Sequence, residues 1–299
     1  MRTWVKLLLA LGIFAAGNFL FAAILATGMA RFYGLSKRSE LLILGHSHVM
    51  LALNEAMLER RLNIRVSKYT REGVSVAERD LMAEQYLRGG SSDGLRCVVY
   101  GVDPWLFTAS GLSSNSLVNF YPMLDDPVIA PYLRENMENG EYCKMRLFPL
   151  CRFQDAAINA GIAGWVRQGK ASFKFGRVDI EQVRRDIRLG RFRRIGIDPE
   201  SVKIFRRTIR RFTKRGIRVI LLNTPIVDLL NEAEPTVRDE VDKIFRSVAS
   251  DPLVEYWDLN SEYGHEYALF RDQIHLNRVG QEAVTRNIGE KLCHEVFAH

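Results

Sequence analysis

Short apolar runs alternate along this chain with longer segments in which apolar residues recur at helical spacing. Short runs that end in glycine or polar residues are typical of buried strands, and a spacing of three and four residues predicts amphipathic helices. Strands that alternate with helices indicate an α/β fold with a parallel sheet of about five strands. The expected strands are residues 41–44, 64–69, 96–100, 217–222 and 254–257, and the expected helices are residues 51–62, 76–87, 201–214, 237–248 and 278–295.

One uncharged segment near the N-terminus is long enough to cross a membrane. The 24 residues from Leu7 to Ala30 carry no charge and are bracketed by Lys6 and Arg31. As an α-helix they would extend about 36 Å, compared with about 30 Å for the hydrocarbon core. The alternative is a secretory signal, because residues 28–30 resemble a small-x-small cleavage site, but signal peptides have apolar regions of only about 7–15 residues. We expect an uncleaved single-pass anchor, whose flanking charges do not set its orientation.

The alternation of strands and helices is interrupted between Pro104 and Pro199. This segment is first rich in Gly, Ser, Asn and Pro, and is then strongly basic. Because a structureless loop of this length is implausible in a compact domain, we expect a helical insertion packed over one edge of the sheet. The predicted organisation is an anchor and linker at residues 1–36, then an α/β domain at 37–299 with an insertion at about 104–199.

Basic residues are concentrated in one part of the chain. The formal net charge is +7, and residues 167–218 hold 18 Lys or Arg against five Asp or Glu. Such a segment is either a pair of solvated helix faces or a surface that contacts anionic lipid headgroups or an acidic polymer. No zinc-finger, RRM or homeodomain signature accompanies the charge, so nucleic acid is not an expected partner.

The four cysteines form no CxxC or zinc-binding pattern. Cys97 and Cys293 lie in apolar segments, and we expect both to be buried free thiols. Cys143 and Cys151 flank a short segment and would be able to form a disulfide in an oxidising compartment.

A serine follows the first predicted strand, within the sequence Leu44-Gly-His-Ser-His48. Ligands of doubly wound sheets collect at the carboxyl ends of the strands, where a serine hydroxyl is well placed as a nucleophile. Gly45 allows the backbone to turn tightly and leaves the hydroxyl of Ser47 uncovered. The alternative is a helix N-cap, which is a common role for a serine after a strand.

A second polar group, Asp272-Gln-Ile-His-Leu-Asn277, precedes the last predicted helix. A serine hydroxyl needs a base that removes its proton, and a histidine needs a carboxylate that sets its tautomer and stabilises its charged form. Asp272 and His275 supply both groups from one loop, although an Asp-x-x-His sequence alone is more often a surface turn. Together with Ser47, these residues predict a Ser–His–Asp catalytic triad.

These motifs resemble those of the SGNH/GDSL hydrolase superfamily, which has a flavodoxin-like α/β fold. That family has its serine just after the first strand and Asp-x-x-His in its last block. Here Gly45-His-Ser47 matches the first block, with His46 in place of the usual Asp, and residues 272–280 match the last block. The resemblance covers residues 40–103 and 217–297, and the middle of the chain is unmatched.

The resemblance also implies an oxyanion hole. Its donors would be the backbone N–H groups of Ser47 and of Gly73, which follows the second predicted strand as the family's second block does. The third block usually reads Gly-x-Asn, whereas this chain has Gly101-Val-Asp103. An acidic residue repels an oxyanion unless it turns away or is protonated, so Asp103 departs from the family pattern at this position.

Three further side chains are expected near the predicted nucleophile. We expect His48 to pack beside it, His46 to have a structural role, and Trp105 to belong to the core or to line the pocket. A His-x-His pair binds a metal in some hydrolases, here with Asp272 and His275 as further ligands. No additional His-rich or Asp-rich motif supports that alternative, so the predicted site contains neither a metal nor a cofactor.

Within the superfamily, the anchor, the Gly-x-Ser-His sequence and the insertion resemble the envelope acyl-transfer branch. That branch includes alginate O-acetylation proteins and the D-alanyl transfer protein of teichoic acid synthesis. The resemblance implies a single-pass protein of the cytoplasmic membrane with its domain on the extracytoplasmic side. It would be a serine esterase or O-acyltransferase that acts on an acylated polysaccharide or other envelope glycan, beside a multispanning membrane acyltransferase. Two alternatives stay open: a catalytically silent module that binds a polymer or a membrane acyltransferase, and a metal-dependent hydrolase.

Overall fold

The computed structural model describes residues 3–109, 116–166 and 174–297, which form two compact units. The helical unit consists of residues 1–36 and 115–168, and the α/β unit consists of residues 37–114 and 169–299. Each unit has a hydrophobic core of its own.

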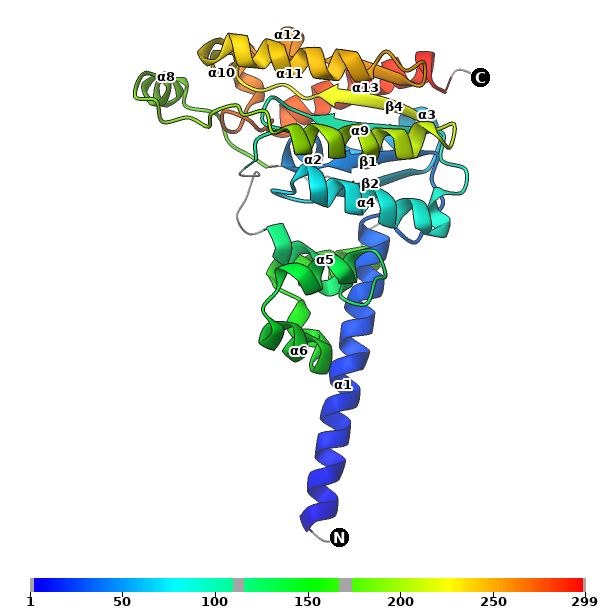
Figure 1. The fold of residues 1–299 in the computed structure, drawn as a ribbon. Helices are drawn as coiled ribbons and strands as arrows, with labels where there is room; N and C mark the ends of the chain where they lie inside the picture. Colours follow the sequence, from blue (N-terminus) through cyan, green and yellow to red (C-terminus); the bar gives the residue numbers. More distant parts are fainter. Residues whose placement is uncertain (1–2, 110–115, 167–173, 298–299) are drawn as a thin grey trace. The chain divides into compact units, whose positions relative to one another are not determined.

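The α/β unit is built on a five-stranded, fully parallel sheet (Figure 1). Its strand order is β2-β1-β3-β4-β5, the doubly wound order of flavodoxin-like folds. The predicted α/β fold class with a flavodoxin-like parallel sheet of about five strands is therefore confirmed, and each strand begins and ends within two residues of its expected bounds. The strands are β1 (Leu41–Gly45), β2 (Val66–Thr70), β3 (Cys97–Val102), β4 (Arg218–Asn223) and β5 (Val254–Asp258).

Helices cap their first turns with polar side chains. Ser75 and Glu78 form a capping box at the start of α4. Asn54 accepts a hydrogen bond from the Met57 N–H and begins α3, so the single helix expected at residues 51–62 is two short helices, α2 and α3. The helices of this unit are α2 (Ser47–Ala52), α3 (Glu55–Leu62), α4 (Val76–Arg88), α8 (Ile180–Arg188), α9 (Pro199–Thr213), α10 (Asp228–Ala233), α11 (Pro235–Val248), α12 (Asn260–Tyr263) and α13 (Arg278–Glu295), with 3-10 turns η1 (Gly90–Ser92) and η4 (Tyr267–Leu269).

Helices cover both faces of the sheet, so every residue of β1, β2 and β3 is buried. The main core joins Leu41 and Ile43 of β1 to Leu58 of α3 and to Ile288 and Leu292 of α13. The uninterrupted apolar runs of the sequence are thus strands that contact helices on two sides.

Part of the basic segment is neutralised inside the α/β unit. Arg207 and Arg211 of α9 both donate hydrogen bonds to the buried carboxylate of Asp80 in α4. Contact of the basic segment with anionic lipid headgroups or an acidic polymer stays a prediction.

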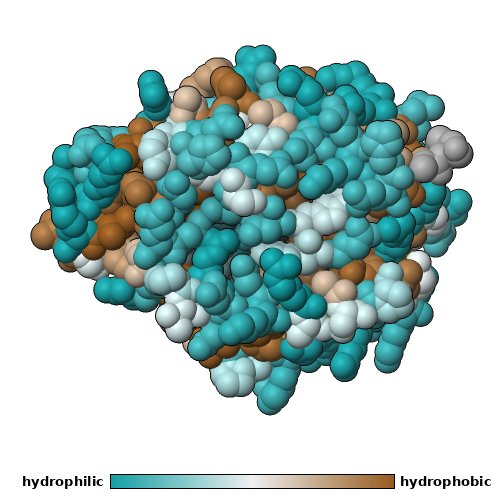
Figure 2. All heavy atoms as spheres, turned by 90° about the horizontal axis from the view of Figure 1, so that it is seen from above, coloured by the Kyte–Doolittle hydropathy of each residue, from teal (hydrophilic) through white to brown (hydrophobic). Residues whose placement is uncertain are grey.

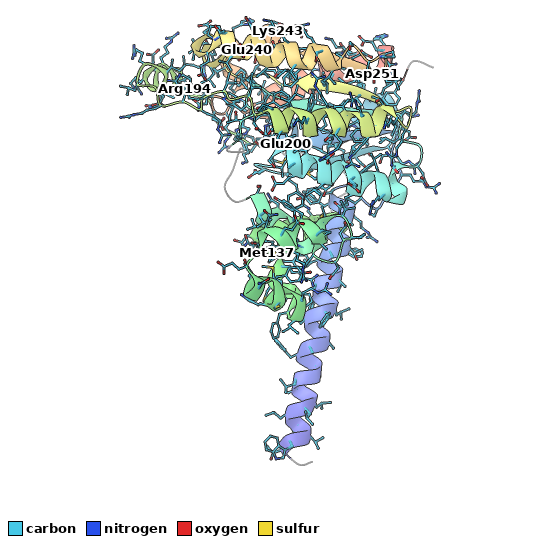
Figure 3. All side chains as sticks on the ribbon, viewed as in Figure 1. Met137, Arg194, Glu200, Glu240, Lys243 and Asp251 are labelled. Carbon is cyan, nitrogen blue, oxygen red and sulfur yellow. The ribbon has the colours of Figure 1, made fainter. Side chains whose placement is uncertain are left out.

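The face on the side of α11 is mostly hydrophilic (Figure 2), and Glu240 and Lys243 project from that helix (Figure 3).

The helical unit is organised around one long apolar helix, α1 (Thr3–Phe32). Among the described residues, it is the one helix long and apolar enough to cross a membrane. Side chains project freely from its N-terminal half (Figure 3), whereas its C-terminal half packs against α7. The remaining elements are η2 (Ser116–Met123), α5 (Ile129–Asn136), α6 (Asn139–Leu147), η3 (Pro149–Arg152) and α7 (Asp155–Val166).

Glycines bring α1 and α7 into backbone contact. A Cβ at Gly28 would lie 1.9 Å from the carbonyl oxygen of Gly161, and a Cβ at Gly164 would lie 1.8 Å from that of Gly28. Small residues allow this close approach, which is common between membrane helices. The indole Nε1–H of Trp165 also donates to the carbonyl of Ile24 at 3.0 Å. The two helices therefore pack as one body.

The interrupted region of the sequence is divided differently from the expected insertion at about 104–199. Residues 115–168 belong with α1, whereas residues 169–199, including α8, belong to the α/β unit. The physical reason lies in α7, which is rich in Gly and Ala and carries no charge after Asp155 in its first turn, so that it matches α1 rather than the edge of a sheet.

All four cysteines are free thiols. Cys97 is buried as expected, but Cys293 is exposed. That prediction was wrong because Cys293 lies on the solvent side of α13, whose apolar side is formed by Ile288 and Leu292. Cys143 and Cys151 are both exposed and do not form a disulfide.

Candidate active site

Ser47, His275 and Asp272 form a hydrogen-bonded chain at the carboxyl end of the sheet. Ser47 Oγ lies 2.9 Å from His275 Nε2, and both carboxylate oxygens of Asp272 lie 3.0 Å from His275 Nδ1. The carboxylate favours the tautomer with a proton on Nδ1, which leaves the Nε2 lone pair facing the serine hydroxyl. This is the arrangement expected from two motifs that are 228 residues apart.

Ser47 is the first residue of α2, and one residue, His46, separates it from the end of β1. After this turn, the Val49 side chain packs against two glycines, and it occupies the space that a Cβ would need at either one. A Cβ at Gly45 or at Gly101 would lie only 2.7 Å from the Val49 side chain. Gly45 also has a φ of 154°, which residues with a Cβ rarely adopt. These glycines, near the ends of β1 and β3, bring Ser47 close to the sheet.

Buried side chains from two other elements hold the end of α2. Lys68 of β2 donates two hydrogen bonds of 2.6 Å, while Gln281 and Thr285 of α13 donate one each, at 2.8 and 3.3 Å. An α-helix leaves its last carbonyls without intrahelical partners, and these four bonds satisfy them. Because α13 begins three residues after His275, the bonds from Gln281 and Thr285 couple the nucleophile to the base. The accepting carbonyls are those of Met50 and Leu53 for Lys68, Leu51 for Gln281, and Ala52 for Thr285.

Backbone groups hold the loop that carries the base. Asp272 Oδ1 accepts the N–H groups of Ile274 at 3.1 Å and of His275 at 3.0 Å. Asn277 caps α13 by accepting the Gly280 N–H at 3.1 Å. The carboxylate and the imidazole are thus positioned by local hydrogen bonds before any substrate binds.

The predicted triad is partly open to solvent. The side chains of His275 and Asp272 are 18% and 40% exposed. Burial alone would raise the pKa of Asp272, but hydrogen bonds from the His275 ring and from backbone N–H groups outweigh burial and lower that pKa. Asp272 is therefore ionised at neutral pH and stabilises the imidazolium that forms when His275 accepts a proton.

A second His–Asp pair lies beside the nucleophile and is fully buried. His46 Nε2 is 3.0 Å from Asp103 Oδ2, and Arg79 Nη2 is 3.8 Å from the same oxygen. Asp103 Oδ1 accepts the Trp105 N–H at 2.9 Å, and Arg79 Nη1 donates to the Gly101 carbonyl at 2.9 Å. An ionised carboxylate has no proton to donate, so Asp103 supports this buried group and is not suited to bind an oxyanion.

Burial and neighbouring charges together determine the protonation states of the buried group. Burial raises the pKa of Asp103, but His46, His48 and Arg79 outweigh burial and lower that pKa. Burial and the Arg79 charge lower the pKa of His46 to about 4. Burial also lowers the pKa of His48 well below its usual value. At neutral pH the guanidinium therefore balances the carboxylate, and both histidines are neutral.

His46, His48 and Asp103 also offer one ligand atom each within 4.8 Å of one another. Such a set resembles a zinc site by residue type. The buried Arg79 guanidinium already neutralises the carboxylate, and it would repel a divalent cation placed beside it. His46, His48 and Asp103 are therefore better suited to a buried group whose negative charge is balanced by Arg79 than to a metal site.

His48 and Trp105 lie next to the predicted triad. The His48 ring makes edge contacts with the rings of His275 and Trp105, with centroids 5.3 and 6.2 Å apart. Trp105 is buried, and its Nε1–H donates to the Arg193 carbonyl at 2.9 Å. Gly73 lies in the turn after β2, with a φ of 70°, at the same end of the parallel sheet.

Four buried polar residues of the site belong to no motif and were not predicted: Lys68, Arg79, Gln281 and Thr285. A signal for three of them was present in the sequence. Arg79 lies on the apolar side of the helix expected at 76–87, and Gln281 and Thr285 lie four residues apart on the apolar side of the last helix. A polar residue on an apolar helix face indicates a specific buried partner.

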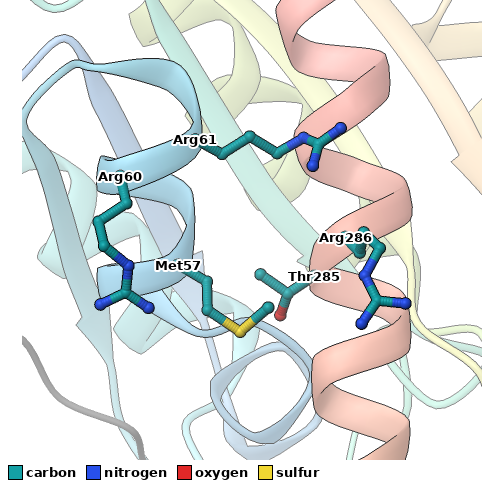
Figure 4. A pocket seen from close by; sticks show the side chains of 5 residues that line it. All are labelled: Met57, Arg60, Arg61, Thr285 and Arg286. Atoms are coloured by element: carbon teal, nitrogen blue, oxygen red, sulfur yellow. The ribbon is translucent and has the colours of Figure 1, made fainter.

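A separate cleft of about 290 Å³ lies between α3 and α13 (Figure 4). The described residues that line it do not include the predicted triad. Its one hydroxyl, on Thr285, is already bonded to the backbone of the α2–α3 segment. We therefore assign no chemistry to this cleft. The lining residues are Met57, Arg60, Arg61, Thr285 and Arg286.

No known family model and no curated protein matches the chain. Several solved structures match it at low sequence identity. A Streptococcus pneumoniae protein described as a platelet activating factor is 13% identical, with 95% of this chain and 99% of that chain covered and a TM-score of 0.40. The C-terminal catalytic domain of peptidoglycan O-acetyltransferase A from the same species is 12% identical, with coverage of 86% and 93% and a TM-score of 0.37. A lipase from a goat rumen metagenome is 12% identical, with coverage of 83% and 94% and a TM-score of 0.36.

Proposed function

We propose that the chain is a membrane-anchored serine esterase or O-acyltransferase that acts on an acylated carbohydrate of the cell envelope. The observation that carries this proposal is the continuous contact from Ser47 Oγ through His275 to Asp272. A base within hydrogen-bonding reach of a serine, and oriented by a carboxylate, is the arrangement that activates a hydroxyl for acyl transfer.

In the first half-reaction, His275 Nε2 accepts the hydroxyl proton while Ser47 Oγ forms a bond to the ester carbonyl carbon. Negative charge develops on the carbonyl oxygen, and the backbone N–H groups of Ser47 and Gly73 are the proposed donors to it. The bond between the carbonyl carbon and the alkoxy oxygen then breaks. His275 gives its proton to that oxygen, and the acyl group remains on Ser47 as an ester.

In the second half-reaction, a hydroxyl oxygen attacks the acyl group on Ser47. His275 removes the proton from the attacking oxygen and returns it to Ser47 Oγ as the acyl bond breaks. Water as the attacking group gives hydrolysis, and a sugar hydroxyl gives transfer. Asp272 remains ionised throughout and stabilises the imidazolium in both halves.

The proposal includes retention of α1 as an anchor. Cleavage after Ala30 would remove Ala22 and Met29 from the core of the helical unit, together with the backbone contact of Gly28 with α7. A cleaved signal peptide contributes nothing to the core of the mature protein. The shared core of α1 and α7 thus supports an uncleaved helix.

The proposed substrate is an acylated polysaccharide or other envelope glycan outside the cytoplasmic membrane, and a multispanning membrane acyltransferase is the proposed partner in transfer. The sequence resemblance to envelope acyl-transfer proteins motivates this choice. Partial exposure of His275 and Asp272 supports it, because a polymer reaches such a site more readily than an enclosed one.

Ester turnover by the full-length chain in detergent tests the proposal. We expect release of acetate from a simple acetyl ester and from an O-acetylated glycan, with loss of both in Ser47→Ala. Ser261→Ala, which changes an exposed serine of α12, is the matched control and should keep full activity. A folded wild-type protein that neither hydrolyses nor transfers acetyl groups would instead be a silent binding module.

A further inference from the structure

We infer that the helical unit contacts the lipid bilayer through an apolar rim, formed by Leu147, Phe148 and Leu150, and that only the N-terminal part of α1 crosses the hydrocarbon. The inference rests on the anchor included in the proposed function. Beyond the proposed function, the inference states how deeply α1 lies in the bilayer and adds a second surface that contacts lipid. The three rim side chains are 67%, 42% and 37% exposed, respectively.

Helix α1 is longer than a bilayer requires. Its 30 residues extend about 45 Å, compared with about 30 Å for the hydrocarbon core. The first buried residue along the helix is Ala22. The part from Thr3 to Phe21 is uncovered except at the half-buried Gly17 and Asn18, and it extends about 28 Å. This part alone matches the hydrocarbon thickness. Lys6, near its N-terminal end, reaches the headgroups by extending its side chain along the helix.

One side of the rest of α1 is covered by protein, whereas Ala23, Ile24 and Thr27 are exposed. Gly28 contacts the backbone of α7, and Met29 is buried in the shared core. At the C-terminal end, the guanidinium of Arg31 lies 3.8 Å from the ring centroid of Trp165. The side of α1 that packs against α7 cannot also contact acyl chains, and we therefore place the hydrocarbon boundary near Ala22, where this packing begins.

The rim lies at the level of this boundary. The backbone N–H of Leu150 donates to Asn18 Oδ1 at 3.2 Å, which places η3 beside α1 one helical turn before Ala22. Leu147 and Phe148 directly precede η3. The exposed apolar side chains of the rim therefore stand beside α1 near the place where its uncovered part ends.

Charged residues lie next to the rim but not within it. Lys144 and Arg146 are exposed on α6, and Arg146 donates to Asp125 at 2.7 Å. An apolar edge with adjacent cationic side chains is typical of protein segments that insert shallowly among lipid headgroups. The continuity of the rim with a membrane-spanning helix favours the same bilayer as its partner over a separate protein.

Spin labelling of the full-length chain in phosphatidylethanolamine and phosphatidylglycerol vesicles tests the inference. Cys143, Cys151 and Cys293 are first changed to Ser, and the buried Cys97 is kept. Single cysteines are then placed at the rim, at Lys144 as the neighbouring control, and at Ile13 and Thr27 of α1. The measurement compares collisions of each label with oxygen, which concentrates in hydrocarbon, and with a polar nickel chelate, which stays in water.

We expect the oxygen-to-nickel ratio to be several-fold higher at the three rim positions and at Ile13 than at Lys144 and Thr27. A high ratio at Ile13 with water-like ratios at the rim would overturn the inference and leave the anchor intact. A ratio at Thr27 as high as at Ile13 would also overturn it, because the bilayer would then extend along the covered part of α1. Water-like ratios at Ile13 as well would contradict the anchor of the proposed function itself.

Discussion

Two histidine–aspartate pairs lie at the carboxyl end of the sheet, and they differ in their surroundings rather than in their residue types. His275 and Asp272 are 18% and 40% exposed, and the free ring nitrogen of the pair faces a serine hydroxyl. His46 and Asp103 are 2% and 0% exposed, and the carboxylate of that pair faces the guanidinium of Arg79. The first pair is open to a substrate, and the second pair is closed to one.

The difference shows how environment assigns a role to the same two side chains. A histidine acts as a base only when its imidazolium is stabilised and a proton donor is within reach, as for His275. Burial and a neighbouring cation oppose protonation of His46, so its pair contributes to packing and charge balance. Each of the following predictions separates loss of chemistry at the open pair from loss of stability at the closed pair.

The largest expected effect is on activity. Ser47→Ala should lower kcat for an acetyl ester by about 10⁶-fold, because the nucleophile is lost, while the free energy of unfolding stays unchanged. His275→Ala should match it, and His265→Ala, which removes an exposed histidine, is the control. Ester kinetics together with urea unfolding check the prediction. Residual activity above a few per cent in either triad variant would show that another group supplies the nucleophile or the base.

Asp272→Asn should lower kcat by a smaller factor, about 10⁴-fold. The amide keeps the nucleophile and the base in place but no longer favours the productive tautomer or stabilises the imidazolium. Because the side chain is partly exposed, the free energy of unfolding should change by no more than about 1 kcal/mol. Equal losses in Asp272→Asn and His275→Ala would mean that the carboxylate does more than orient and stabilise the ring.

Asp103→Asn should reverse this pattern by acting mainly on stability. It leaves the guanidinium of Arg79 buried without a counter-charge, which lowers the free energy of unfolding by about 3–5 kcal/mol. Urea unfolding measures the loss, and Asp239→Asn on the exposed side of α11 is the control. Adding Arg79→Met to Asp103→Asn should recover part of the stability. If the Asp103→Asn protein had the same free energy of unfolding as the wild type, the role assigned to the buried pair would be contradicted.

The smallest effect is a pH dependence of stability. The pKa of His46 is about 4 in the folded protein and about 6.5 in the unfolded chain, so the unfolded state binds a proton first as the pH falls. This contribution to stability is complete above pH 6.5 and is lost between pH 6.5 and 4. Between pH 7.5 and 5, the wild type should lose about 2 kcal/mol more than His46→Gln. Parallel pH profiles of the two proteins would show that His46 is not held neutral.

The sheet and the open pair could be predicted from sequence because local patterns encode them. The apolar run at residues 41–44 ends in Gly45, and the Asp-x-x-His loop contains both its base and its carboxylate. The parallel winding of the sheet then brings Ser47 to the same edge. The one distant contact of the triad, between Ser47 and His275, therefore follows from the winding of the sheet.

The rest of the molecule depends on contacts that no local pattern encodes. The packing of Gly28 against Gly161 and Gly164 joins segments more than 130 residues apart, so the division of the interrupted region could not be predicted. The role of Arg79 depends on its position next to Asp103, which departs from the family pattern at the third block and so gave no sign of this partner.

Covalent labelling with a fluorophosphonate tests the central claim most directly, because the probe reacts with an activated serine and needs no known substrate. The full-length protein is labelled in detergent and the modified peptide is identified by mass spectrometry. We predict one adduct, on Ser47, that is lost in His275→Ala and retained in His265→Ala. A folded wild-type protein that stays unlabelled, or that is labelled equally well without His275, would contradict the assignment of Ser47, His275 and Asp272 as a catalytic triad.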